Sequence, residues 1–325
     1  MLSNQPLFFC FLAIYIVLFL LVSPAVFAQE YFVLRGDLHV HSDYSHDSDV
    51  PLAQVIEESI QTGYDFIALT EHNTRNHLFE DHSVPGLFVL PGYELTLQNA
   101  HINLFGIRDF KENIGLITPK EVTEYLNYIR DLGGYTSLDH PNDPNFPSRY
   151  KYDLPLDFVE VWNNAHFGSD DLQTLHEWHD LLVEGRRLFA VAGSDAHRNH
   201  LDRGPFNHVY VTEKSAEAIL YALEQGRNYL TASIDGPDIQ LSYGDSIMGS
   251  EVEYVAGANI LLTIERVATG SVIKVYSDQG LELEFTAEET LISKPLPMDG
   301  GSFYRVEVWT SSGSMVAISN PIFIN

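Results

Sequence analysis

The residues of this 325-residue sequence that could do chemistry are, first, histidines in close pairs. His39 and His41 are separated by one residue and end an apolar segment that predicts a β-strand. In an extended chain, residues i and i+2 point the same way, so both imidazoles would face one side of the sheet. Two neutral histidines held in this way can begin a binding site for Zn, Mn or Fe, although two ordinary polar residues at a strand end give the same pattern.

Other histidines and carboxylates recur in short motifs that lie at or near the ends of predicted strands. These motifs are Thr70-Glu71-His72-Asn73, Gly92-Tyr93-Glu94, His101, Asp139-His140-Pro141 and Gly193-Ser194-Asp195-Ala196-His197. In α/β barrels, active sites are built at the C-terminal ends of several strands at once. Scattered polar residues would not coincide with strand ends in this way, so the set as a whole predicts a metal site.

The segments that must position these motifs alternate between strands and helices. Predicted strands are short apolar runs at 32–39, 66–69, 87–90, 101–105, 135–138, 158–162, 188–192 and 208–211. Predicted helices cover 51–62, 119–131, 170–183 and 215–224, and Thr118 with Glu121 forms a capping box for the second of them. Repeated strand–helix units over about 200 residues indicate an α/β barrel-like domain.

After Gly236-Pro237 the pattern changes to short strands without helices. Strands are predicted at 239–241, 260–264, 273–277, 282–285, 304–309 and 315–318. This pattern favours a small all-β, sandwich-like domain over 236–325, with a boundary near 232–238.

Taken in order, the motifs between His39 and His197 resemble those of the PHP (polymerase and histidinol phosphatase) superfamily. The Gly-Ser-Asp-Ala-His motif, the N-terminal export signal described below and the C-terminal β-region look most like its CehA/McbA branch, which includes carbaryl hydrolase. The resemblance implies a distorted (β/α)7 PHP barrel over 29–235 that holds two or three divalent metal ions.

The resemblance also implies roles for individual residues. One metal would be held by His39, His41, Glu94 and Asp195. Glu94 would bridge to a second metal, held also by His101 and His140. Two cations about 3.5–4 Å apart would share a water whose pKa falls far enough to give hydroxide, the expected nucleophile, near neutral pH. Ligands without sulfur suit Zn, Mn or Fe and do not choose among them.

A third metal would use His72 and His197 with one more ligand. The family has Ser-Asp-Gly after the second histidine, whereas this chain has Ser45-His46-Asp47. Direct alignment favours His46 as the ligand, and a slip of one residue makes Asp47 the alternative.

Several neighbours of the motifs are expected to support the site. Asp37 and Asp139 should orient a ligand or cap a loop. Trp162, Asn163 and Asn164 are expected to line a pocket at a strand end. Arg198, just after the last motif, could bind a substrate anion or form a structural ion pair.

Composition narrows the possible partners. The chain has 18 Lys and Arg against 45 Asp and Glu, for a net charge of -27. Nucleic acids and anionic membrane surfaces are bound through basic residues, so neither is an expected partner. Cys10 is the only cysteine, which excludes disulfide frameworks and zinc sites built from thiolates.

The N-terminal segment indicates export. An unbroken apolar run from 7 to 22 is followed by small residues, and Val26 and Ala28 suit signal-peptidase cleavage before Gln29. The run is shorter than the roughly 20 residues of a bilayer span, although residues 1–6 lack the usual basic residue. A signal peptide over 1–28 therefore predicts a periplasmic or secreted protein, and an uncleaved N-terminal membrane anchor is the alternative.

Three functions follow for the mature chain. The leading one is an exported metal-dependent hydrolase that acts on a small phosphoester, with the phosphoester implied by the resemblance. The second is a carboxyl- or carbamate-ester hydrolase, which the small number of nearby cations, Arg198 and Arg203, keeps open. The third is a metal-stabilised binding module without catalysis, for which so large a ligand set is unusual.

Overall fold

The computed structural model describes residues 29–198 and 203–325. The signal peptide expected over 1–28 lies outside these residues. Within them, no helix is both long enough and apolar enough to cross a membrane.

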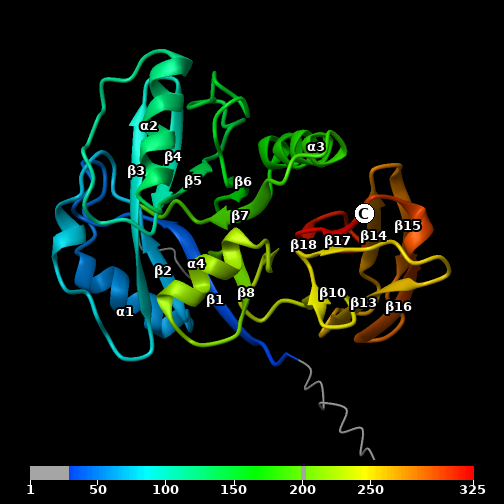
Figure 1. Ribbon diagram of the computed structural model, residues 1–325. Coiled ribbons are helices and arrows are strands. Elements are labelled where there is room, and N and C mark those ends of the chain that lie inside the picture. The colour runs from blue at the N-terminus through cyan, green and yellow to red at the C-terminus, as the bar shows by residue number, and fades with distance from the viewer. Residues whose placement is uncertain (1–28, 199–202) are drawn as a thin grey trace, which may run out of the picture.

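The N-terminal part is a curled sheet with helices outside it (Figure 1). Its strands are β1 (Phe32–Val40), β2 (Phe66–Leu69), β3 (Phe88–Leu97), β4 (Ala100–Phe105), β5 (Tyr135–Leu138), β6 (Phe158–Asn163), β7 (Phe189–Gly193), β8 (Phe206–Val211) and β9 (Asn228–Thr231). Its helices are α1 (Leu52–Thr62), α2 (Pro119–Asp131), α3 (Ser169–Val183) and α4 (Ala216–Glu224), with a 3-10 turn η1 (Asn76–Phe79). The expected mixed α/β class is confirmed.

Local sequence accounts for the helix ends. Helix α2 begins at Pro119 after a complete capping box, in which the Thr118 hydroxyl accepts from the Glu121 N–H and the Glu121 carboxylate accepts from the Thr118 N–H. Helix α1 ends at Gly63, whose left-handed backbone at φ 90° suits glycine.

Strand directions in the curled sheet are mixed. Strands β1, β2 and β3 run parallel, and so do β5, β6 and β7. Strand β4 is antiparallel to both of its neighbours, and β8 is antiparallel to β1. Among the described residues, β2 and β3 are joined by η1 without an α-helix, so the regular (β/α)7 pattern stays a prediction.

Strands β1 and β7 come together beside the predicted site. The Asp195 N–H donates to the His39 carbonyl at 2.8 Å, and the His41 N–H donates to the Ala196 carbonyl at 3.1 Å. Farther along β7, side-chain amides replace strand pairing: Asn207 bonds both backbone groups of Ala192. These contacts hold the ends of β1 and β7 in register, which brings their motifs together.

The C-terminal part consists of strands in two sheets around one apolar core. The strands are β10 (Asp238–Tyr243), β11 (Ser246–Ile247), β12 (Glu251–Val252), β13 (Asn259–Glu265), β14 (Val272–Ser277), β15 (Gly280–Thr286), β16 (Leu291–Pro297), β17 (Phe303–Trp309), β18 (Met315–Ser319) and β19 (Ile322–Ile324), with a 3-10 turn η3 (Met298–Gly300). One sheet has the order β11-β10-β13-β16. The other sheet continues into the curled sheet, because β18 pairs antiparallel with β9.

Polar side-chain contacts also join the two parts. The buried Arg305 of β17 donates to His179 Nδ1 of α3 at 3.1 Å and to Glu307 at 2.7 Å. Asn320 bonds both backbone groups of Ala190 in β7. The division at 232–238 falls between β9 and β10, and whether the two parts are separate domains stays a prediction.

Candidate metal centre

Strands β1 and β7 bring together the first group of possible metal ligands. His39 and His41 are both buried, with ring centroids 5.1 Å apart. The Asp195 Oδ1 atom lies 3.4 Å from His39 Nε2 and 3.1 Å from His41 Nε2. Asp195 has a positive φ of 51°, a conformation that costs energy for a non-glycine residue and is common at functional sites. This group can supply three donor atoms to one ion.

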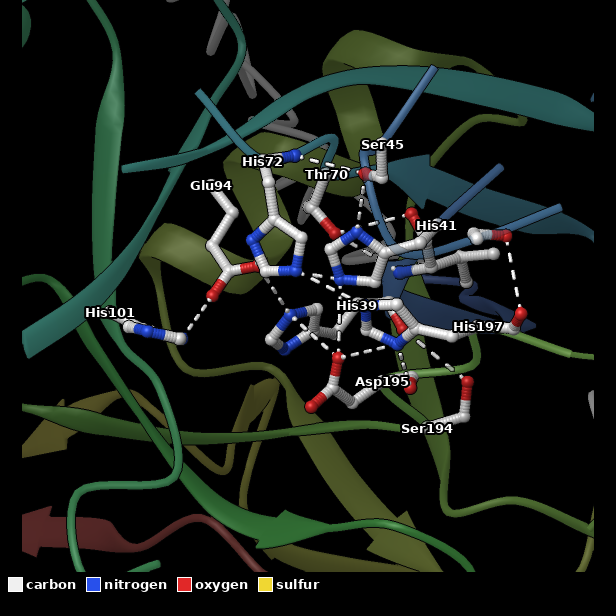
Figure 2. Close-up of polar contacts among 12 residues, drawn as sticks. His39, His41, Ser45, Thr70, His72, Glu94, His101, Ser194, Asp195 and His197 are labelled. Carbon is white, nitrogen blue, oxygen red and sulfur yellow. Dashed lines mark hydrogen bonds and ion pairs between the residues drawn. The ribbon is translucent and has the colours of Figure 1, made fainter. Parts of the chain in front are cut away.

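Glu94 lies at the centre of the cluster, and its two oxygens face different histidines (Figure 2). Oε2 lies 2.8 Å from His72 Nδ1, 3.4 Å from His39 Nε2 and 3.3 Å from His41 Nε2. Oε1 lies 2.7 Å from His101 Nδ1 and 4.0 Å from His140 Nε2. The β3–β4 hairpin explains the second contact, because its register sets His101 opposite Thr96, two residues beyond Glu94. A carboxylate placed in this way can serve two ions.

A third group forms around His72 and His197, whose Nε2 atoms are 3.1 Å apart. The Asp47 carboxylate lies 3.4 Å from each of these nitrogens. The His46 ring lies 5.3 Å from the His72 ring, centroid to centroid, but its side chain is 75% exposed and neither of its nitrogens forms a hydrogen bond with His72 or His197 in the described part of the chain. The geometry therefore favours Asp47 and corrects the preference for His46.

Several buried atoms in the cluster have no hydrogen-bond partner among the described residues. They include His41 Nε2, Glu94 Oε1, His140 Nδ1 and Asp195 Oδ1. Unpaired buried polar atoms are costly, and a cation would satisfy those that face one another. The donor set of imidazole nitrogens and carboxylate oxygens also fits a divalent transition metal.

The electrostatics of the cluster favour charged carboxylates. Burial opposes ionisation of Glu94, but its close contacts with His101 and His39 outweigh burial and hold its pKa well below the usual range. Burial also opposes ionisation of Asp195, but the charge of His39 and the contact with His41 outweigh it and lower the pKa of Asp195. Burial lowers the pKa of His41 to about 4, which keeps its imidazole neutral. Ionised carboxylates and neutral imidazoles are the forms that bind metals.

Asp37 and Asp139 behave differently from each other. Asp37 Oδ1 accepts from the backbone N–H groups of His39 and Ser194, both at 3.0 Å, so it caps the loop and does not orient an imidazole. Burial raises the pKa of Asp37 to about 6. Both carboxylate oxygens of Asp139 are buried without a hydrogen-bond partner among the described residues.

Sequence reasoning missed one buried acid beside the cluster. Glu160 lies in β6, and its Oε1 atom is 2.9 Å from His39 Nδ1. It falls inside a predicted strand and not at its end, so the search for strand-end motifs passed over it. A carboxylate within an otherwise apolar buried strand is the signal that could have found it.

A cavity of about 340 Å³ opens beside Asp195 and His197. Arg198, Arg203 and Asn164 also line it. Trp162 does not, because its ring is buried in the core against Phe167. Asn163 is also buried and bonds Glu160, so of the three residues expected to line a pocket only Asn164 lines this cavity.

A larger cavity, of about 830 Å³, lies along β2, β3 and the segment between them. His77 and His82 line it, and none of the residues predicted to bind metal does. We therefore place the functional site at the smaller cavity, where the cluster lies.

Comparisons with known proteins agree with this architecture. Residues 37–138 match the PHP domain. A two-domain protein from Bacteroides vulgatus ATCC 8482, described as containing a predicted PHP-like metal-dependent phosphoesterase, is similar over 89% of this chain and 95% of its own. The sequence identity is 17% and the TM-score 0.50, so the likeness concerns the fold.

A second solved structure, the PmoD soluble domain from Methylocystis sp. ATCC 49242 (Rockwell), covers 29% of this chain and 94% of its own. Its identity is 12% and its TM-score 0.22, too low to carry an argument. No curated protein matches the chain.

Proposed function

We propose that this protein is a metal-dependent hydrolase that acts on small phosphoesters. The observation that carries the proposal is the position of Glu94. One of its oxygens faces His39, His41 and His72, and the other faces His101 and His140. A carboxylate between two sets of imidazoles is the arrangement that a two-metal hydrolytic centre requires.

The proposed ligand sets follow from the distances. His39, His41, Asp195 and Glu94 would hold the first ion, and Glu94, His101 and His140 the second. His72, His197 and Asp47 would hold a third. Bound Zn, Mn or Fe would lower the pKa of a bound water and neutralise negative charge that develops on the ester. The number of ions, two or three, and their identity belong to the proposal.

Arg198 and Arg203 support an anionic substrate. Both line the cavity beside Asp195 and His197, in a chain with few basic residues. A guanidinium can bind two oxygens of a phosphate at once and would orient the ester toward the cluster. Carboxyl or carbamate esters are the second candidate, in keeping with the proposed CehA/McbA branch, and a neutral ester would need neither arginine.

We also propose that the chain is exported through a signal peptide over 1–28 and acts outside the cytoplasm, in the periplasm or as a secreted protein. The apolar run and the small residues before Gln29 support this, and an uncleaved membrane anchor is the alternative. Detection of a mature chain that begins at Gln29 in an extracytoplasmic fraction would test it.

The experiment that tests the function joins elemental analysis with a substrate panel. The chain from Gln29 onward would be analysed for metals and assayed with chromogenic phosphomonoesters, phosphodiesters and carboxyl esters. Two or three ions per chain with phosphoester turnover are expected. Turnover of carboxyl esters alone would favour the second candidate, and fewer than two ions after reconstitution would leave a binding module without hydrolysis.

A further inference from the structure

Glu160 uses both oxygens of its buried carboxylate at the edge of the metal cluster. Oε1 lies 2.9 Å from His39 Nδ1. Oε2 accepts from the His140 backbone N–H at 3.0 Å and from Asn163 Nδ2 at 2.9 Å. One side chain thus contacts a ligand of the proposed first ion and a ligand of the proposed second ion.

The contact with His39 determines which ring nitrogen is free. A neutral imidazole carries its proton on one nitrogen and a lone pair on the other. When His39 is the neutral imidazole that binds a metal, a carboxylate accepting at Nδ1 keeps the proton there, and the lone pair of Nε2 then faces Glu94 and Asp195. Carboxylates that accept from metal-bound histidines fix the tautomer and the ring orientation in this way.

The contact with His140 acts on the backbone. His140 has a φ of 27°, in the region that residues other than glycine rarely adopt. Such a conformation persists when surrounding contacts hold it, and the bond from its N–H to Glu160 is one of these contacts. The His140 ring then lies with Nε2 4.0 Å from Glu94 Oε1.

Gly193, at the end of β7, supplies the space for this pair. A Cβ atom at residue 193 would lie 2.2 Å from His39 Cβ and 2.3 Å from Glu160 Oε1. Contacts that short do not occur, so any larger residue would displace His39, Glu160 or both. Steric exclusion of a Cβ atom therefore explains why the Gly-Ser-Asp-Ala-His motif begins with glycine.

We infer that Glu160 is a positioning residue that sets the ligand geometry of two neighbouring metal ions by holding the His39 ring and the His140 backbone. The inference rests on the proposed metal centre and adds a residue that holds two of its ligands.

The test measures metal binding in place of turnover. Zn²⁺ affinity would be determined by competition with a chromogenic chelator for the wild type, Glu160→Gln and Glu160→Ala. Loss of the hydrogen-bond partner of a metal-binding histidine weakens metal binding roughly 10- to 100-fold. We expect a loss in that range for Glu160→Gln, which keeps an acceptor for His39 but not the charge, and a larger loss for Glu160→Ala.

Glu307→Gln is the matched control. Glu307 is also buried and accepts from two donors, Arg305 and Trp309, in the C-terminal part. The Glu307→Gln substitution should lower the melting temperature and leave the Zn²⁺ affinity unchanged. In the Co²⁺-substituted protein, the visible absorption bands should shift for Glu160→Gln and stay unchanged for Glu307→Gln, which separates positioning from a general loss of stability.

Two outcomes would overturn the inference. If Glu160→Gln binds Zn²⁺ as tightly as the wild type, Glu160 does not position the ligands, although the proposed centre stands. If the wild type binds no Zn²⁺, Mn²⁺ or Fe²⁺, the proposed function fails and the inference fails with it.

Discussion

Replacing Glu94 with glutamine changes one atom and removes one negative charge at the centre of the cluster. The carboxylate is completely buried; one of its oxygens faces His39, His41 and His72, and the other faces His101 and His140. The substitution would therefore weaken the binding of two ions and not of one, while the similar shape of glutamine preserves packing.

The expected loss of turnover in Glu94→Gln follows from the number of ions that Glu94 would hold, which is two. Even an indirect partner of a metal ligand contributes roughly 10- to 100-fold, and a direct ligand should contribute at least as much. For two ions the factors multiply to about 10²–10⁴ in turnover, equivalent to about 2.7–5.4 kcal/mol at 1.36 kcal/mol per tenfold.

The assay combines metal content, turnover and thermal unfolding for the wild type and Glu94→Gln, with Glu307→Gln as the control for loss of a buried charge. We expect Glu94→Gln to retain a cooperative unfolding transition but to lose metal and turnover. If it bound the wild-type complement of metal and hydrolysed the substrate at the wild-type rate, the bridging role of Glu94 would be refuted.

Four other predictions test different parts of the structure. Asp47→Asn should remove one metal ion per chain and His46→Gln none, as measured by elemental analysis; the reverse result would restore His46 as the ligand. Arg198→Gln should raise KM for a phosphomonoester several-fold and leave KM for a neutral carboxyl ester unchanged; equal effects on both would argue against anion binding. Burial, aided by the charge of Arg35, lowers the pKa of His208 to about 3 in the folded protein. The unfolded chain binds this proton near pH 6.5, so the folded state loses stability as the pH falls from 6.5 toward 3. The loss should be roughly 2 kcal/mol at pH 5, and urea unfolding at pH 5 and pH 7.5 should show a smaller pH effect in His208→Gln than in the wild type. Removal of metal by a chelator should lower the melting temperature, and added Zn²⁺ should restore it in a concentration-dependent way, because ligands that bind only the folded state stabilise it; a melting temperature insensitive to both would contradict a metal centre.

The parts of the fold that the sequence predicts well are those with strong local signals. Helix α2 begins and ends as its capping box and following glycines indicate. The strands β2 and β5 have the predicted bounds. Strand β2 is an apolar run between Asp65 and Thr70, and β5 lies between Gly134 and Asp139. Strand β3 is longer than predicted, since Pro91 and Gly92 are typical of a strand end but here pair with Leu69 and Phe105 of the neighbouring strands.

The residues of the candidate site also fall into those that the sequence predicts and those that it does not. Most residues of the cluster lie in motifs at strand ends, which the spacing reveals. Whether His46 or Asp47 faces His72 depends on the path of a turn, which no periodicity describes. The contact between Glu160 and His39 joins residues 121 positions apart, so only the assembled sheet brings it about.

The pairing of β9 with β18 has a consequence for the order in which the molecule folds. Every proposed ligand precedes Arg198 in the sequence. One edge of β9 nevertheless stays unpaired until β18, close to the C-terminal end of the sequence, has been synthesised and pairs with it. Asn320, which follows β18, also supplies the hydrogen bonds of Ala190 in β7, the strand that leads to Asp195. An early folding intermediate would therefore expose both an unpaired strand edge and an unsupported β7, and such edges attract other chains. The proposed metal centre takes its ligands from the first part of the chain, whereas the strand that leads to Asp195 is supported by the last part.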